Sequence, residues 1–261
     1  MTRLRFWKMS GAGNDFVVLE GRALPGDGPG PRLTEELCDR RRGIGADGVL
    51  VVHARGVGEV EASYRNADGS SADFCGNGAR CAARFAVERG LSGEQQMLRF
   101  AGVAIAARVE GDIVGIEVPR PELLETLEPA GAPGPIRRVR AGVEHLVAEE
   151  PDAGALPLER VATLAGRAPG EINVTVYHAG RQGMLFTRTL ERGSGETLAC
   201  GSAALAVAAL ASTGREVVIT PPAGIPLTVR TPAAPAPFTL IGEARVVFDG
   251  EYRLDPSSLD R

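Results

Sequence analysis

The sequence predicts an α+β protein made of two pseudo-symmetric halves, each a β-barrel-like mixed sheet wrapped around one central α-helix. Three observations support this fold class: many short β-rich stretches, two Ala-rich helical stretches with few charges, and an internal repeat that carries one such helix in each half. A helix that is apolar nearly all round belongs in a protein interior. Strands wrapped around each helix would bury it.

The predicted strands are rich in Val and Ile and are bounded by Gly and Pro turns. They cover residues 16–19, 49–52, 113–118, 172–177, 216–220 and 245–248. Two minor helices are also expected. One is capped by Thr34, continues through Arg41 and ends at Gly43, and the other covers residues 158–164.

The internal repeat aligns residues 75–79 (Cys-Gly-Asn-Gly-Ala) with residues 200–204 (Cys-Gly-Ser-Ala-Ala). Each cysteine follows a Gly-rich polar turn and opens an Ala-rich helix. About half of the 261 residues separate the two cysteines, which indicates a duplicated domain. The predicted first half is 1–118, completed by the C-terminal strand 247–261. The second half is 119–246, with prolines at the junction.

The repeated cysteines, Cys75 and Cys200, stand where a helix leaves N–H groups without intrahelical partners. These groups and the helix dipole favour a thiolate, so both thiol pKa values are expected to be lowered. The glycines that follow, Gly76 and Gly201, would let a carboxylate approach the backbone, as anion sites at helix N-termini require.

Two such helix ends on opposite sides of one substrate suit proton transfer at a carbon next to a carboxylate. One sulfur would remove the proton and the other would deliver a proton to the opposite face, while N–H donors stabilise the carbanion. The pattern predicts a cofactor-independent amino-acid racemase or epimerase. No pyridoxal-binding lysine is evident, and Lys8 is the visible lysine.

Composition excludes several other classes. The net charge of -4 and the scattered basic residues argue against a nucleic-acid partner. No apolar stretch could span a membrane and the N-terminus lacks a signal-peptide core, so a cytoplasmic protein is expected. The cysteines and histidines lack metal-ligand spacing, so no metal site is expected. Cys38 and Cys81 are interpreted as buried apolar residues. The expected partner is a small-molecule amino-acid substrate, and a homodimer is compatible with the sequence.

Four stretches, 6–16, 42–48, 66–81 and 191–201, are long and unusual in composition. In them the chain resembles the diaminopimelate epimerase family, and the resemblance extends over nearly the whole chain. It implies the fold described above and the epimerisation of LL- to meso-2,6-diaminopimelate, a precursor of lysine and of cell-wall cross-links. It also implies that catalysis needs no cofactor.

The resemblance assigns roles to individual residues. Cys75 and Cys200 would be the acid and base, and His145 and Glu191 would tune their pKa values. The carboxylate at the reacting carbon would be held by Gly76, Asn77, Gly201 and Ser202. The rest of the substrate would be held by Asn14, Asn66, Asn173, Glu191 and Arg192.

The chain departs from the family pattern before the histidine. Gly142-Val143-Glu144-His145 stands where the family has Gly-Asn-Pro-His, so Val143 replaces an asparagine that contacts the distal end of the substrate. A lost buried polar contact costs about 1–3 kcal/mol.

Three alternative functions are considered. The change at Val143 and Glu144 prompts the first, a two-cysteine racemase for another amino acid. The others are a binding protein that has lost the chemistry and a thiol oxidoreductase. The last would need two closely spaced cysteines.

Overall fold

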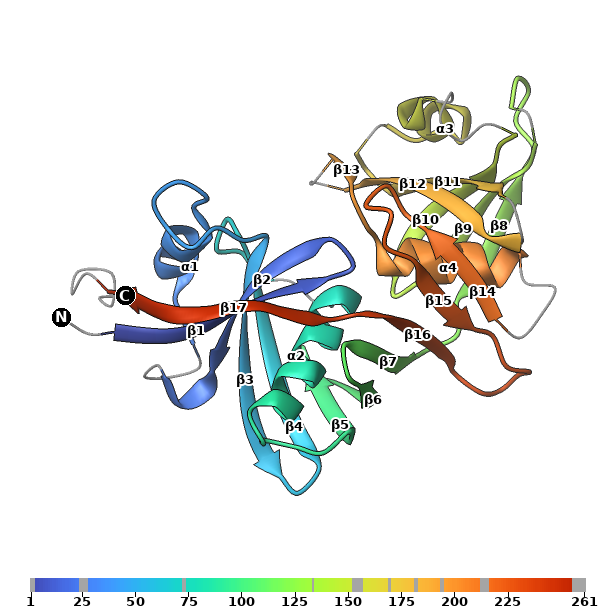
Figure 1. Ribbon diagram of the computed structural model, residues 1–261. Helices are drawn as coiled ribbons and strands as arrows, with labels where there is room; N and C mark the ends of the chain where they lie inside the picture. The colour runs from blue at the N-terminus through green and yellow to red at the C-terminus, as the bar shows by residue number, and fades with distance from the viewer. Residues whose placement is uncertain are drawn as a thin grey trace. The chain divides into compact units, whose positions relative to one another are not determined.

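The computed structural model describes residues 3–23, 28–71, 74–132, 134–151, 157–168, 170–180, 183–192, 195–211 and 216–254. The chain divides into two compact units (Figure 1). The first unit comprises Met1–Ile116 and Gly242–Arg261, and the second comprises Glu117–Ile241. Of the C-terminal stretch predicted to complete the first half, residues 255–261 lie outside the described part of the chain.

The first unit is one mixed sheet whose strands follow the order β17-β1-β2-β3-β4-β5-β6-β7. The pairs β2–β3 and β4–β5 are parallel and the other neighbours are antiparallel. The strands are β1 (Arg3–Gly11), β2 (Asn14–Glu20), β3 (Gly48–Gly56), β4 (Glu59–Asn66), β5 (Gln95–Phe100), β6 (Val103–Glu110), β7 (Ile113–Val118) and β17 (Arg245–Arg253).

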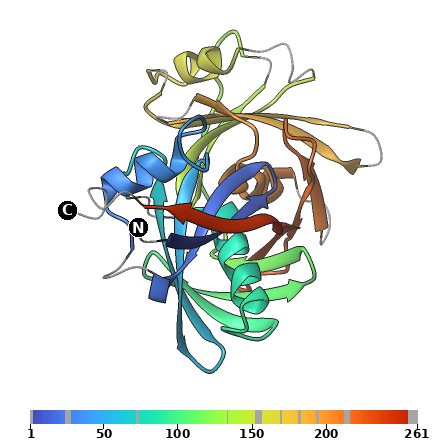
Figure 2. The same ribbon diagram turned by 60° about the vertical axis from the view of Figure 1, so that its left-hand side comes forward.

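The central helix of the first unit is α2 (Gly76–Glu88), which contacts β17 and all strands from β1 to β6. Figure 2 shows the red strand β17 passing beside the teal helix α2. Residues 77–83 of the helix are buried throughout, and the ring of Phe85 packs edge-on against Trp7 at 5.1 Å. The sheet therefore wraps this helix, as the sequence predicts.

The second unit has the strand order β8-β9-β10-β11-β12-β14-β15-β16, with β13 beside β12. Its central helix α4 (Gly201–Ala211) contacts β9, β10, β12, β14 and β15. The strands are β8 (Glu122–Leu127), β9 (Ile136–Ala141), β10 (Val143–Glu149), β11 (Asn173–Ala179), β12 (Leu185–Glu191), β13 (Gly195–Thr197), β14 (Glu216–Thr220), β15 (Leu227–Arg230) and β16 (Phe238–Glu243).

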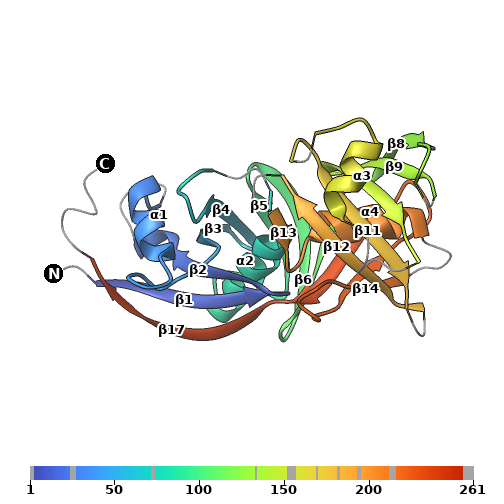
Figure 3. The same cartoon turned by 90° about the horizontal axis from the view of Figure 1, so that it is seen from above.

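The two units repeat one topology. In the first, α1 (Pro31–Cys38) connects the parallel pair β2–β3, and α2 connects β4–β5. In the second, α3 (Leu158–Leu164) connects β10–β11, and α4 connects β12–β14. Figure 3 shows α1 and α3 as short helices in their respective units. Each packs its apolar side on its own sheet, α1 on β3 and β4 and α3 on β10, β11 and β12.

The prediction for the first minor helix is wrong at both ends. The helix begins at Pro31 after Gly30, and Thr34 lies inside it with its hydroxyl donating to the Gly30 carbonyl at 3.0 Å. Proline is favoured at this position because its fixed φ suits the first helical turn. The helix ends at Cys38, where Asp39 turns the chain by accepting backbone N–H groups with its carboxylate.

Candidate active site

Cys75 occupies the N-cap of α2, the central helix of the first unit. Its backbone is extended, with φ −135° and ψ 107°, and its sulfur accepts a hydrogen bond from the Gly78 N–H at 3.3 Å. Gly76 and Asn77 are the first two residues of the helix, so their N–H groups lack intrahelical acceptors. The half-buried sulfur therefore lies beside backbone donors that suit an anion.

Cys200 has the same position in the second unit, directly before α4. Its carbonyl accepts the Ala204 N–H at 3.1 Å, and its sulfur accepts a hydrogen bond from the backbone of Ala203. In both units the third residue after the cysteine donates to the sulfur. The sequence repeat thus becomes a repeat of local geometry, with Gly201 and Ser202 in the first turn of α4.

Polar side chains surround Cys200 in the second unit. The Ser202 hydroxyl lies 3.3 Å from the Cys200 sulfur and 2.9 Å from Nε2 of His145. The other ring nitrogen of His145 lies 3.1 Å from the Thr175 hydroxyl. Because α4 packs on β10, which carries His145, a partly buried chain of hydrogen bonds links the fully buried imidazole to the sulfur through the Ser202 hydroxyl.

Glu191 and Asn173 complete this half-site. Glu191 at the end of β12 hydrogen bonds Cys200 and accepts the Thr197 hydroxyl at 2.6 Å. The side-chain oxygen of Asn173 accepts the backbone N–H of Arg192 at 2.8 Å, and its amide nitrogen lies 3.5 Å from Nε2 of His145. The structure thus brings together five predicted residues of the second half, His145, Asn173, Glu191, Cys200 and Ser202, whereas the side chain of Arg192 is exposed.

The prediction of a lowered thiol pKa is wrong for Cys200. Burial and the negative charge of Glu191 raise its pKa to about 12, although Ser202 and the Ala203 N–H favour the thiolate. A helix dipole contributes only about 0.3–1 kcal/mol at a helix end, which is less than the cost of burying a charge beside a carboxylate. Cys200 is therefore a thiol at neutral pH in this conformation.

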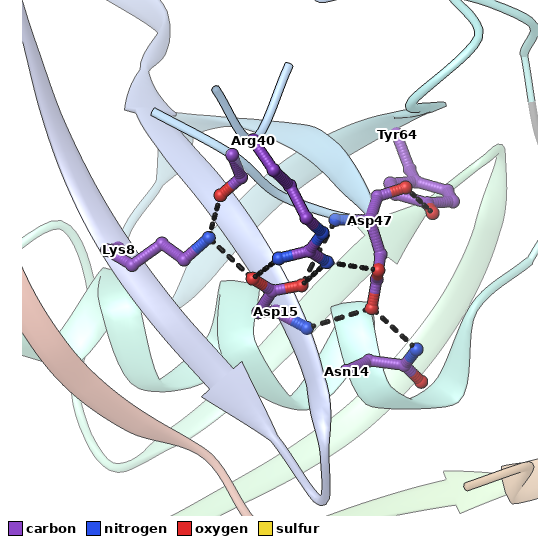
Figure 4. A network of polar contacts seen from close by, with 7 residues as sticks. Lys8, Asn14, Asp15, Arg40, Asp47 and Tyr64 are labelled. Carbon is purple, nitrogen blue, oxygen red and sulfur yellow. Dashed lines mark hydrogen bonds and ion pairs between the residues drawn. The ribbon is translucent and has the colours of Figure 1, made fainter. Parts of the chain in front are cut away.

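Two predicted asparagines of the first unit, Asn14 and Asn77, are joined by a hydrogen bond from the Asn77 amide to the Asn14 oxygen. Asn14 in turn donates to Asp47 at 3.0 Å, and Asn77 accepts from buried Arg80 at 2.6 Å. Tyr64 donates to the Asp47 carbonyl at 3.3 Å (Figure 4). The side-chain amides of Asn14 and Asn77 are therefore each held by two hydrogen bonds, one through the oxygen and one through the nitrogen.

An ion cluster of Lys8, Asp15, Arg40 and Asp47 adjoins Asn14, which donates to Asp47 (Figure 4). Asp15 accepts from Lys8 at 2.6 Å and from both terminal nitrogens of Arg40, one of which also reaches Asp47 at 2.7 Å. Lys8 also donates to the Gly45 carbonyl. Burial opposes ionisation of Asp15, but hydrogen bonds from Arg40 and Lys8 outweigh it and hold the pKa of this carboxyl well below its ordinary range.

Asn66 lies apart from this network. It ends β4, where its side chain donates to the Ser70 hydroxyl at 3.0 Å and its backbone N–H donates to the Ser70 carbonyl at 2.9 Å. In this structure it stabilises the polar turn that precedes Cys75. The structure therefore shows for Asn66 the turn-forming role that asparagine often has.

Val143 and Glu144, the two departures from the family pattern that precede His145, lie on opposite faces of β10. Glu144 forms ion pairs with Arg140 at 3.0 Å and Arg138 at 3.6 Å. Because side chains alternate along a strand, Val143 shares the face of His145, and it is 43% exposed. Of the two substitutions, Val143 is the one that changes the surface on the His145 side.

Sequence reasoning missed Arg80, Arg40, Asp15 and Asp47 as parts of the site. Asp15, Asp47 and Arg80 fall inside the stretches that carry the family resemblance, which is the one signal that could have found them, whereas Arg40 lies outside those stretches. Within the described ranges, no group of three or more His, Cys, Asp and Glu side chains is suited to a metal ion. None of the described helices combines the length and apolar character needed to cross a bilayer.

The fold is shared with solved structures of epimerases and related proteins. A hydroxyproline epimerase from Agrobacterium vitis superposes with a TM-score of 0.67 at 16% identity, over 99% of this chain and 95% of that one. A putative phenazine biosynthesis PhzC/PhzF protein from Clostridium difficile gives 0.72 at 13% identity, over 96% and 100%. The fold and the two capping cysteines define a class: two-unit proteins with an N-capping thiol on each central helix.

Within this fold, sequence comparison shows the family. Residues 6–112 match the diaminopimelate epimerase family model. The diaminopimelate epimerase of Xylella fastidiosa (strain M12) is 39% identical over 95% of this chain and 96% of its own length, and that of Azoarcus sp. (strain BH72) is 34% identical over 96% and 99%. The chain belongs to the diaminopimelate epimerase family.

His145 makes the stability of the second unit depend on pH. Burial lowers its pKa to about 3, whereas an unfolded chain takes up this proton near pH 6.5. Between these values the unfolded state binds more protons, so stability falls as the pH falls, by about 2 kcal/mol from pH 6.5 to pH 5. Urea unfolding followed at both pH values would measure this loss. The His145→Asn variant should lose about 2 kcal/mol less over the same interval, and an equal loss in both proteins would contradict the assignment.

Proposed function

We propose that the protein epimerises LL-2,6-diaminopimelate to meso-2,6-diaminopimelate by proton transfer between two sulfurs, Cys75 and Cys200, without a cofactor. The supporting observation is that each unit places a cysteine at the N-cap of its central helix, with an N–H donor on the sulfur. Membership of the family supports the substrate. The product is a precursor of lysine and of peptidoglycan, and the enzyme acts in the cytoplasm on a small molecule, as a monomer or a homodimer.

The reaction needs two steps at one carbon. A thiolate takes the α-proton, the C–H bond breaks, and the electron pair spreads into the adjacent carboxylate. The thiol of the other cysteine then gives its proton to the opposite face and is left as a thiolate. The N–H groups of Gly76, Asn77, Gly201 and Ser202 hold the carboxylate where this charge develops.

The neighbours of the sulfurs tune the two proton transfers. His145 is neutral because burial lowers its pKa, so it acts on Cys200 through the Ser202 hydroxyl and not as a cation. Glu191 stabilises the thiol form of Cys200. Asn14, Asn66, Asn173 and Arg192, with Glu191, bind the remainder of the substrate.

An isotope experiment tests this function. Purified, reduced protein is incubated with LL-diaminopimelate in heavy water. The stereoisomers are separated by chiral chromatography, and their deuterium content is measured by mass spectrometry. We expect meso product with one deuteron at the inverted α-carbon. Absence of exchange by folded, reduced protein would rule out the proposal. Other L-amino acids are run in parallel to identify the substrate: faster exchange with one of them would show that this amino acid, and not diaminopimelate, is the preferred substrate.

A further inference from the structure

Arg80 is a buried cation beneath the first turn of α2. Its side chain is fully buried, five residues after Cys75. One terminal nitrogen donates to the Asn77 side-chain oxygen at 2.6 Å, and the other to the Gly76 carbonyl at 3.3 Å. Its Nε has no acceptor among the described residues. The guanidinium therefore contacts the two residues that follow Cys75.

The charge of Arg80 lacks a carboxylate partner within 4 Å in the described part of the chain. Burial lowers its pKa to about 10, so it remains charged at neutral pH, and the groups that favour its charged form are Cys81 and Cys75. A buried charge without compensation is costly. Two carboxylates of this region have other partners. Asp47, which connects to Arg80 only through Asn14 and Asn77, binds Arg40, and Glu243, whose charge acts on Cys81, pairs with Arg245.

Of the two sulfurs near Arg80, Cys81 remains a thiol. It is fully buried, and burial strongly raises its pKa despite the attraction of Arg80. Cys75 is half-buried at the helix N-terminus and receives the Gly78 N–H. The anion that can balance Arg80 is therefore the Cys75 thiolate.

The second unit has the opposite electrostatics. Five residues after Cys200 stands Leu205, an apolar side chain buried in α4, so no cation occupies the position equivalent to Arg80. Cys200 instead hydrogen bonds a carboxylate, Glu191. With the same backbone geometry at both sulfurs, Cys75 therefore has a cation, Arg80, as its charged neighbour, and Cys200 has an anion, Glu191.

We propose that Arg80 is a positioning residue that keeps Cys75 as the thiolate of the resting enzyme and fixes the side chain of Asn77. Together with Glu191 on the other half-site, it makes Cys75 the resting base and Cys200 the resting acid. The roles of Cys75 as base and Cys200 as acid rest on the proposed function, whereas the charge state of Cys75 does not depend on it.

The test measures how fast iodoacetamide modifies Cys75 as a function of pH, with peptide mass spectrometry to separate it from the other cysteines. In the unmodified sequence the pH midpoint should lie below about 8.5, the ordinary value for a thiol. Arg80→Met should raise the midpoint by about one pH unit, since an adjacent opposite charge shifts a titration by about 1–3 units. The modification rate at pH 7 then falls by about tenfold, because the thiolate is the reactive form.

Two further variants separate charge from structure. Arg80→Lys keeps the charge but loses the fork that holds Asn77, so its midpoint should move by less than half as much while KM rises. Arg84→Met, on the same helix, removes an ion pair with Glu88 that is 2.9 Å long and should leave the midpoint unchanged. The pH profile of kcat/KM should move in parallel with the alkylation midpoint.

Each outcome decides the inference. A midpoint at or above about 8.5 in the unmodified sequence overturns it, even if Arg80→Met does not fold. An unmoved midpoint in folded Arg80→Met also overturns it. Because alkylation requires no substrate, a shifted midpoint in a protein that fails the deuterium experiment would retain the role of Arg80 and reject the proposed function alone.

Discussion

Replacing either Cys75 or Cys200 by alanine is expected to lower kcat/KM for epimerisation by at least about 10³-fold, within the range that one acid or base contributes. A methyl group can neither accept the α-proton nor deliver one. Each variant also loses the N–H···S bond at its helix start, a cost of about 0.5–2 kcal/mol, so both variants are expected to fold. The measurement is the rate of meso product formation by each variant.

The two variants should also differ in a diagnostic way. In Cys200→Ala, Cys75 is still able to remove and return a proton on its own side, so one stereoisomer should exchange its α-hydrogen with solvent without inversion. The matched control is Cys38→Ala. The Cys38 side chain, at the end of α1, belongs to the apolar cluster between α1 and the sheet, so this variant should change stability only. Near-normal turnover by Cys75→Ala would exclude the two-sulfur mechanism.

The fold could be predicted because the repeat and the apolar helices are properties of the sequence itself. The stretches 75–79 and 200–204 become the starts of α2 and α4, and the strands predicted at 113–118 and 216–220 are β7 and β14. The first minor helix was misplaced because Thr34, a good cap in isolation, follows a proline that starts the helix three residues earlier.

The environment of each sulfur could not be predicted in the same way. The pKa of Cys200 depends on its burial and on Glu191, which lies at the end of β12, and neither can be recognised from the residues next to Cys200 in the sequence.

The ion cluster of Lys8, Asp15, Arg40 and Asp47 depends on the register of the parallel pair β2–β3. Phe16 pairs with Gly48, so the preceding residues Asp15 and Asp47 lie side by side.

Replacing Asp15 by alanine is expected to destabilise the first unit by about 3 kcal/mol. Lys8, the only lysine of the chain, has a side chain that is 9% exposed and would keep only the Gly45 carbonyl as partner. Removing one member of a buried ion pair costs about 3–5 kcal/mol, and we take the lower end because the Asp15 side chain is 23% exposed. Calorimetry should show the melting temperature of this unit falling by roughly 10 °C. Because Asp15 also holds Arg40 against Asp47, which orients Asn14, KM should rise as well.

The control is Glu251→Ala, which breaks an exposed pair with Arg3 and should leave the melting temperature nearly unchanged. Adding Lys8→Met to Asp15→Ala should restore part of the loss, since the cost lies in a stranded buried charge. Equal melting temperatures of the single and double variants would show that the stranded charge is not the cause.

The pKa of Asp15 is depressed in the folded state. The contribution of Asp15 to the free energy of unfolding is therefore complete above the unfolded pKa of about 3.9 and is lost as the pH falls below it. The difference in stability between Asp15→Ala and the unmodified sequence should therefore be constant near neutral pH and narrow in acid.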